Sequence, residues 1–186
     1  MASKRDKRAK ERTPAAVIGR RLEDARFRTE LIQFIQRVIL IAFAAWIFLT
    51  KVFVITQAQG QNMFPFVKDG DLIIAFRLER NYVKGDIVVC SVNGETYVGR
   101  IAAIENDVVN MDGSGALTVN GTVQTGEIIY PTVAKPGIEY PYRVLEGSVF
   151  LLGDYRTAAT DSRDFGPLSL KDVKGKVITI LRRRQL

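Results

Sequence analysis

The side chains that carry out covalent chemistry in proteins are few in this sequence. It contains no histidine and a single cysteine, Cys90. These counts exclude an intrachain disulfide framework, the usual zinc sites and any catalytic pair in which histidine activates serine or cysteine. A hydrolase built from this sequence would therefore need a lysine or a carboxylate as its general base.

The other nucleophilic or basic candidates are isolated from one another along the chain. Lys68 precedes a turn signal at residues 69–70. Cys90 and Ser91 fall in a predicted strand, and Ser162 lies in a charged loop. Each has an ordinary structural interpretation, as a solvated turn lysine, small core residues or a hydroxyl bonded to backbone. An unusual catalytic pair made from them remains an alternative.

A group of carboxylates near the C-terminus is the remaining candidate for chemistry. Asp154, Asp161 and Asp164 lie within eleven residues of one another. Arg156 and Arg163 are interleaved with them and compete as ion-pair partners, which argues against a metal site. We expect a charge-paired loop and no metal or cofactor, with a merely solvated loop as the alternative.

One segment is long and apolar enough to cross a membrane. Every residue from Val38 to Leu49 is apolar, and Arg37 and Lys51 flank this run. A spanning helix needs about 20 residues, a length that is reached when the two basic side chains extend toward the interfaces. We therefore predict a single uncleaved membrane anchor.

Two other interpretations of the apolar run are weaker. A cleaved signal peptide would need small residues just after it, and Thr56–Gly60 is a poor cleavage site. A buried amphipathic helix would show a 3.6-residue period, which the run lacks. The predicted division is a basic cytoplasmic tail at 1–30, with a short amphipathic helix near 21–36, a transmembrane helix and flank at 31–55, and an extracytoplasmic domain at 56–186.

The net charge of +7 is concentrated at the ends of the chain. Residues 1–37 carry a balance of +6, whereas residues 52–181 carry −3. Nucleic-acid binding would require basic residues over a folded face, so we expect no nucleic-acid partner. Basic residues before an apolar span keep the N-terminus in the cytoplasm. The predicted location is the cell membrane, with membrane lipid as a partner and the domain outside.

The outer segment is rich in short β-branched runs separated by Gly, Asn and Asp. Turn signals include Asn93-Gly94 and Asn120-Gly121. Seven or more strands without a convincing helix between them predict a mainly β, antiparallel domain. The expected strands cover residues 71–76, 86–92, 96–104, 107–111, 116–119, 148–152 and 176–181.

Three segments, in this order after the apolar run, resemble one family. They are Gly60–Pro65 with the Gly-Asp at 70–71, Gly85–Val89 leading to Tyr97–Arg100, and Gly153–Gly166. Together they are similar to the type I signal peptidases of Gram-positive type, and the match runs from about residue 36 to 181. The third segment is the most specific. The resemblance implies a signal-peptidase-like antiparallel β domain behind a single N-terminal transmembrane helix.

The family cleaves secretory signal peptides with a Ser-Lys dyad, and the resemblance breaks down at these positions. Asn62 stands at the position of the nucleophilic serine, Gly99 at that of the lysine, and Ala159 at that of the hydroxyl that supports the lysine. An asparagine amide is not a nucleophile and glycine has no side chain to act as base. No catalytic residue of the family is therefore intact.

The resemblance leaves a scaffold around these replaced positions. The resemblance implies that the residues of this scaffold support the family's site from behind. They are Asp154, Arg156, Asp161, Ser162 and Arg163. Loss of several members of a catalytic unit costs little more than loss of one, so the joint replacement is typical of a natural pseudoenzyme.

A binding role is the function that this pattern favours. Met63, Phe64 and Pro65, with Phe66, would line the mouth of the site, either as an apolar surface or as part of the core. An exposed strand edge could hold a peptide by β-addition. Signal-peptidase-like proteins that lack the dyad and assist pilus assembly with sortases are similar, which implies secreted or pilin precursors and sortase as partners.

Two alternatives remain open. One is an active type I signal peptidase, a serine endopeptidase that uses non-standard catalytic residues. The other is a Ser-Lys autoprotease of the DNA-damage repressor type, which the membrane anchor and the missing dyad disfavour.

Overall fold

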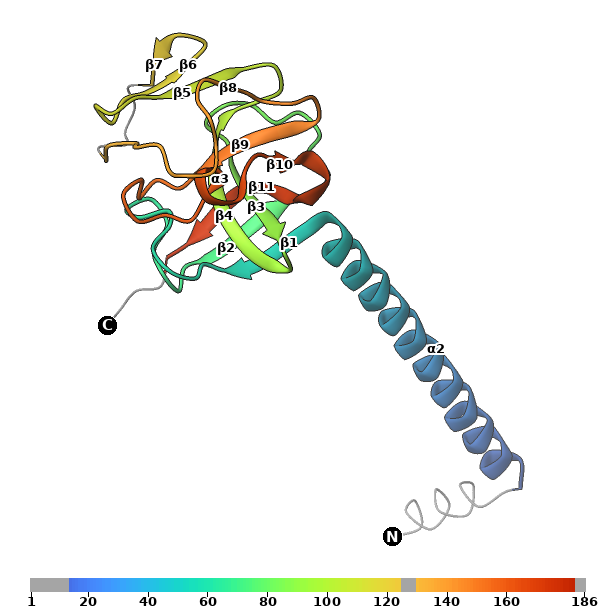
Figure 1. The fold of residues 1–186 in the computed structure, drawn as a ribbon. Coiled ribbons are helices and arrows are strands. Elements are labelled where there is room, and N and C mark those ends of the chain that lie inside the picture. Colours follow the sequence, from blue (N-terminus) through green and yellow to red (C-terminus); the bar gives the residue numbers. More distant parts are fainter. Residues whose placement is uncertain (1–13, 125–129, 183–186) are drawn as a thin grey trace. The chain divides into compact units, whose positions relative to one another are not determined.

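A computed structural model describes residues 14–124 and 130–182 of the chain. It divides into two units, residues 1–49 and 50–186, whose described parts are a long helix and a β domain (Figure 1). The expected fold class, a mainly antiparallel β domain that follows one apolar N-terminal helix, is confirmed.

The N-terminal helix α2 (Pro14–Val52) is longer than the sequence predicts. Proline is favoured at a first helical position, and Lys51 in the last turn complements the helix dipole. The part from Ala25 to Val52 is long and apolar enough to cross a membrane. Much of the predicted tail at 1–30 is thus helical from Pro14 onward, and its first thirteen residues lie outside the described residues.

The last residues of the predicted segment 31–55, which comprised the span and its flank, lie beyond the end of the helix. Residues 53–55 belong to strand β1 (Phe53–Gln57), not to the helix. Phe53 pairs with Phe76 and Ile55 with Ile74 in the neighbouring strand. These residues continue the apolar run, so hydropathy alone does not separate them from the span.

The β domain contains two antiparallel sheets. The larger has the strand order β1-β2-β11-β3-β4-β9-β10 and the smaller β7-β6-β5-β8. Their strands, besides β1, are β2 (Leu72–Phe76), β3 (Ile87–Val92), β4 (Glu95–Ala103), β5 (Val108–Met111), β6 (Leu117–Val119), β7 (Thr122–Val123), β8 (Tyr142–Arg143), β9 (Ser148–Leu152), β10 (Leu168–Ser169) and β11 (Val173–Leu181). A short helix α3 (Ser162–Phe165) and a 3-10 turn η1 (Leu170–Asp172), neither of which the sequence predicts, separate β9 from β11.

The predicted asparagine-glycine turns form the hairpins that order the strands. Asn93 and Gly94 both have positive φ, 51° and 87°, and join β3 to β4. Asn120 and Gly121, at 53° and 77°, join β6 to β7 in the same way. Positive φ at both central residues matches the right-handed twist of a hairpin, and Asn-Gly adopts it at least cost.

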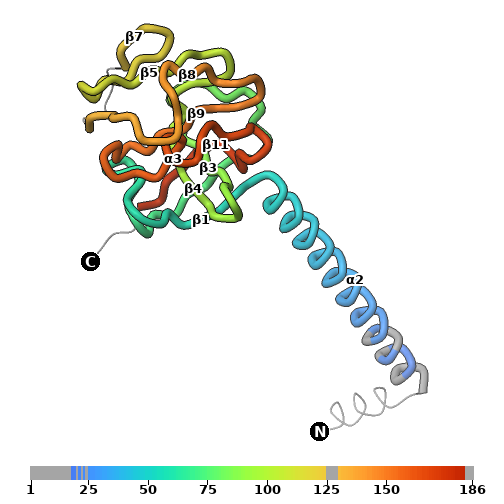
Figure 2. The backbone as a smooth tube through the Cα atoms, in the orientation of Figure 1, coloured from blue at the N-terminus to red at the C-terminus, as the bar shows by residue number. Residues whose placement is uncertain are grey.

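Three apolar clusters form the core and hold the strands in register. One, centred on Ile73, Ala75 and Val89, packs the loop after β1 against the larger sheet. A second lies around Val88, Cys90 and Leu151, and a third lies between the two sheets. The loops at residues 58–71 and 153–165, far apart in sequence, are joined by a backbone hydrogen bond from Tyr155 to Asn62 and can be followed in Figure 2.

Candidate functional site

The first and third motif segments meet at Gly153, which has no room for a side chain. A Cβ atom built there would lie 2.3 Å from the Ala159 Cβ and 2.5 Å from the Asn62 carbonyl oxygen. The Tyr155 amide donates to that same Asn62 carbonyl at 3.0 Å. Asn62 and Ala159 are thus packed together around one glycine, although 97 positions separate them.

Gly99 reaches this region from another strand. It lies in β4, buried, and is paired with Val88 of β3. A Cβ added to it would lie 3.4 Å from the Leu151 Cβ, which is ordinary contact. A side chain at position 99 would therefore start against β9 without a backbone collision.

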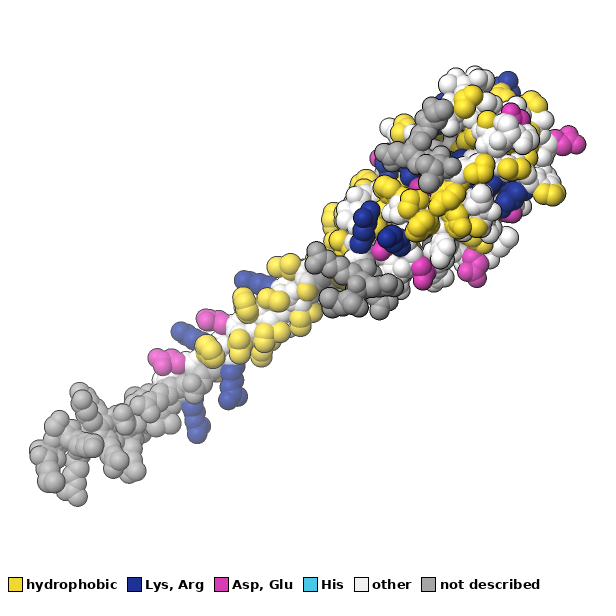
Figure 3. Space-filling model, turned by 90° about the vertical axis from the view of Figure 1, so that its left-hand side faces the viewer, with side chains coloured by type: hydrophobic (Ala, Val, Ile, Leu, Met, Phe, Trp, Pro, Cys, Tyr) yellow, Lys and Arg dark blue, Asp and Glu magenta, His cyan; other side chains and the backbone are white. Residues whose placement is uncertain are grey.

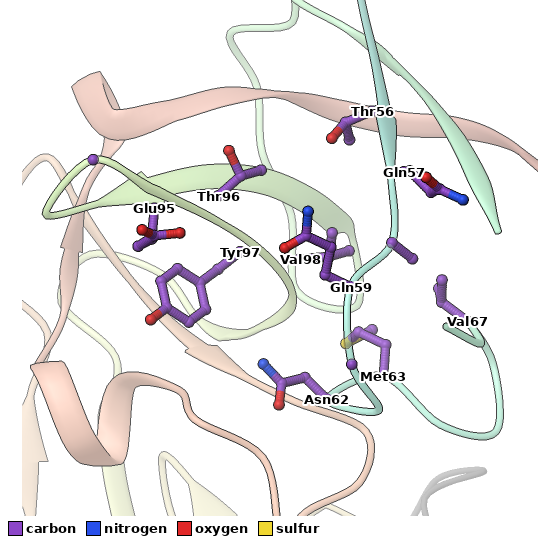
Figure 4. A pocket seen from close by; sticks show the side chains of 13 residues that line it. Thr56, Gln57, Gln59, Asn62, Met63, Val67, Glu95, Thr96, Tyr97 and Val98 are labelled. Carbon is purple, nitrogen blue, oxygen red and sulfur yellow. The ribbon is translucent and has the colours of Figure 1, made fainter. Parts of the chain in front are cut away.

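A cleft of about 160 Å³ opens beside Asn62 (Figure 4). One wall is the segment Thr56–Gly60 with Asn62, Met63 and Val67, and the other is Gly94–Val98 of the β3–β4 hairpin. Buried apolar side chains contribute to its lining. Gly99 and Ala159 are not among the lining residues, because both are buried just beyond it.

The wall formed by β4 carries a free strand edge. Residues 95–100 pair with β3 on one side, whereas pairing with β9 on the other side begins only at Arg100. Among the described residues no strand pairs with the second edge of Glu95–Gly99. Unpaired backbone groups at such an edge accept an extended chain as an added strand.

Behind the cleft, a buried ion pair fixes the loop that follows β9. Both carboxylate oxygens of Asp161 accept from the Arg163 guanidinium, at 2.9 and 2.8 Å, and both residues are 2–3% exposed. Asp161 also accepts from the Gly153 amide at 3.1 Å and caps helix α3, whose Asp164 closes a capping box. The pair therefore holds Gly153, and with it the Asn62 contact, in place.

A second set of bonds continues this network toward β4. Asp154 accepts two bonds from the Arg100 guanidinium, at 2.8 and 2.6 Å. Arg156 donates to the Gly153 carbonyl and to the Thr132 hydroxyl, both at 2.8 Å. Burial lowers the pKa of Arg156 to about 10, so it stays charged at neutral pH.

The comparisons with known proteins agree with this arrangement. A family model described as signal peptidase, peptidase S26, matches residues 28–181. This chain belongs to the signal peptidase family S26. The match covers the apolar half of α2 and the β domain through β11.

Several relatives are similar over part of their length. The chain is 33% identical over 133 residues to the probable thylakoidal processing peptidase 2 of Arabidopsis thaliana, covering 63% of this chain and 35% of that protein. It is 25% identical over 162 residues to signal peptidase I of Bacillus licheniformis, covering 80% and 87%. The chain spans about a third of the length of the two thylakoidal relatives it matches.

One solved structure is similar to part of the chain. The crystal structure of a signal peptidase I from Enterococcus faecalis V583 has a TM-score of 0.45 and 25% identity, and the alignment covers 54% of this chain and 98% of that one.

The other catalytic candidates occupy different environments in the structure. Lys68 is exposed in a turn, whereas Cys90 is fully buried in β3, where burial raises the pKa of its thiol to about 12. Ser162 is also fully buried, and its hydroxyl accepts from the Leu151 amide at 2.9 Å. Ser91 is half-buried in the strand of Cys90.

The aromatic and apolar residues after Asn62 divide between core and surface. Met63 is 3% exposed and belongs to the core while also lining the cleft. Phe64 is half-buried, with its ring edge-on to Tyr155 at 6.1 Å. Pro65 is exposed, and Phe66, 40% exposed, lies 5.3 Å from the Arg100 guanidinium.

Sequence reasoning missed one charged residue of this site. The Lys135 ammonium donates to the Ala159 carbonyl at 2.7 Å and to both oxygens of Asp164, at 2.9 and 2.7 Å. It lies 24 positions before Ala159 in a segment without a motif, so no local signal identified it. With this pair, the three aspartates of the third segment all have cationic partners.

Proposed function

We propose that this S26 protein is a membrane-anchored pseudopeptidase that holds an extended segment of an exported precursor in the cleft and does not cleave it. The observation that carries the proposal is the free edge of β4 at Glu95–Gly99, which faces Thr56–Gly60 across the cleft. An extended chain entering there can bond to the strand edge, and the cleft can receive its side chains.

The absence of cleavage rests on the groups beside that cleft. Asn62 offers an amide where the family resemblance implies a serine, and Gly99 offers no base. In the described part of the chain, no hydrogen bond joins a lysine ammonium to a serine hydroxyl. The lysine ammonium groups with ionic partners there, Lys84, Lys135 and Lys176, pair with aspartates.

The membrane part of the proposal places the β domain on the outer side, with the basic N-terminal residues in the cytoplasm. The +6 balance before the apolar run supports this orientation. Hydrophobic side chains are visible along α2 and on the surface of the β domain (Figure 3). By strand register Ile55, Leu72 and Leu181, 38–67% exposed, share the outer face of β1, β2 and β11, a face suited to lipid contact.

The proposed partners are secreted or pilin-like precursors, with sortase as a further component of surface-protein assembly. The joint replacement at positions 62, 99 and 159 supports a role in assembly rather than in processing. A genomic neighbourhood with pilin and sortase genes would agree with this assignment.

The central test measures binding and cleavage with one probe. The full chain in nanodiscs is titrated with a fluorescein-labelled synthetic secretory signal peptide that includes its cleavage region, and the products are analysed by mass spectrometry. We expect saturable binding without cleavage. Turnover would favour the alternative of an active serine endopeptidase with non-standard residues.

A cleft-filling variant with a matched control locates the binding. Thr96 is exposed on the cleft wall, and Thr122 is exposed on β7 outside it. Thr96→Trp should weaken binding by about tenfold or more because the indole occupies the added strand's position, whereas Thr122→Trp should bind as wild type. Equal binding by both variants would contradict the cleft assignment.

Orientation is tested separately, with protease added to intact protoplasts. We expect digestion of the β domain and protection of the N-terminal tail. Full protection of residues 60–181 would contradict the proposed topology.

A further inference from the structure

The backbone at position 62 is held rigidly at the edge of the cleft. Its carbonyl accepts from the Tyr155 amide at 3.0 Å, and Gly153 packs directly beneath it. The neighbouring Met63 is anchored in the core. The Cα of Asn62 is consequently fixed, and the position of its side chain depends only on the side-chain rotamer.

One polar contact orients the carboxamide. The Thr160 amide donates to the Asn62 Oδ1 at 3.4 Å, a long bond whose donor fixes which end of the amide is oxygen. The amide nitrogen then points the other way, toward the cleft wall that carries Tyr97 (Figure 4). Among the described residues the Asn62 Nδ2 donates to no protein group, so both of its N–H donors are available.

We infer that Asn62 is a peptide-binding residue, whose Nδ2 donates a hydrogen bond to a backbone carbonyl of the extended chain held against β4. This inference rests on the proposed function and adds a specific role to it. A strand added to the free edge of Glu95–Gly99 directs alternate carbonyls away from β4. Those carbonyls face the wall that Asn62 occupies and need donors there once water is displaced.

Substitutions at position 62 distinguish a peptide-binding role from a side chain that is merely exposed to solvent. A neutral hydrogen bond contributes a net factor of about two- to tenfold in affinity. Asn62→Ala removes the donor and should lose this factor. Asn62→Asp keeps an acceptor for Thr160 but turns a carboxylate toward a carbonyl oxygen, so its loss should be larger, more than about tenfold. Asn62→Ser retains a shorter donor and should fall between wild type and alanine.

The experiment pairs these variants with altered peptides. The full chain in nanodiscs binds the labelled signal peptide and a series in which one backbone amide at a time is replaced by an alkene isostere that lacks the carbonyl. The alkene also removes the N–H that the same unit donates to β4, so the replacement should weaken binding to both proteins. At one position the loss for wild type should exceed the loss for Asn62→Ala by about two- to tenfold, which is the share of the Asn62 hydrogen bond. Asn110→Ala, an exposed asparagine on β5, is the matched control and should behave as wild type.

The Asn62 side-chain amide also provides a spectroscopic signature. Its ¹H–¹⁵N signals should shift when the unaltered peptide is added and remain in place with the peptide that lacks the partner carbonyl. A peptide that binds wild type and Asn62→Ala equally would overturn the inference while leaving the proposed function intact. Failure of the peptide to bind wild type would instead overturn the proposed function.

Discussion

The cleft and the network behind it differ in whether their polar groups have partners within the protein. The network buries four charged residues, Asp154, Arg156, Asp161 and Arg163, at 2–6% exposure, and pairs each of them with specific partners. The cleft, in contrast, carries an amide nitrogen and a strand edge without protein partners among the described residues. Polar groups whose hydrogen bonds are made within the protein hold the loop in a fixed shape. Polar groups without a protein partner are available to a ligand.

This difference implies that positions 62, 99 and 159 tolerate a change of side chain without loss of the fold. Asn62, Gly99 and Ala159 form no ion pair, and the backbone groups of Asn62 and Ala159 take part in the hydrogen bonds with Tyr155 and Lys135. The network, on the other hand, cannot lose one partner without leaving a buried charge unpaired. The two regions should therefore respond very differently to substitution.

The largest effect is expected in the network. Arg163→Met leaves the buried Asp161 carboxylate without its bidentate partner and should lower the free energy of unfolding by about 3–5 kcal/mol. Lys84→Met, at a pair whose lysine side chain is 46% exposed, is the control and should cost less than about 1 kcal/mol. Urea titration of the two variants measures the difference. Equal losses would show that the buried pair is not what stabilises the loop.

Gly153 joins the two regions, and a methyl group there should disturb both. Gly153→Ala places a Cβ within 2.5 Å of two fixed atoms and should cost about 1–3 kcal/mol. It should also displace Asn62 and weaken peptide binding. Gly113→Ala is the control, because a Cβ at Gly113 meets no atom within 4 Å. A stable Gly153→Ala variant with unchanged peptide affinity would contradict the tight packing.

The sequence could predict the features that depend on neighbouring residues, but not those that depend on contacts between distant segments. The asparagine-glycine hairpins and the longer β runs after β1 depend on neighbouring residues and were predicted correctly to within a few residues. Strands β7, β8 and β10 are two residues long, and pairing with distant partners rather than propensity defines them. The contact of Lys135 with Ala159 is also non-local, and no pattern in either segment indicates it.

The core thiol provides a third prediction, of intermediate size. Burial raises the pKa of Cys90 to about 12 from an ordinary value of 9.0. The folded state therefore keeps the proton that the unfolded state loses, so stability declines as pH rises from 9 to 12. Between pH 8 and 10 this group should cost about 1 kcal/mol. The pH slope of unfolding should be shallower in Cys90→Ala, and identical slopes would contradict the burial argument.

The smallest effect is expected from rebuilding the family dyad. Asn62→Ser with Gly99→Lys supplies a hydroxyl and an amine, and the new lysine starts 3.4 Å from Leu151 without a collision. Ala159 offers no hydroxyl to orient that amine, and catalytic groups need placement within roughly 0.5 Å. The double variant should give only slight cleavage of the signal peptide, and each single variant none. Mass spectrometry of long incubations measures these traces, with heat-denatured protein as the blank.

Rapid turnover would show that the cleft already holds both groups in a productive geometry. Cleavage by wild type that is lost in Lys68→Met or Ser162→Ala would place the reactive pair elsewhere.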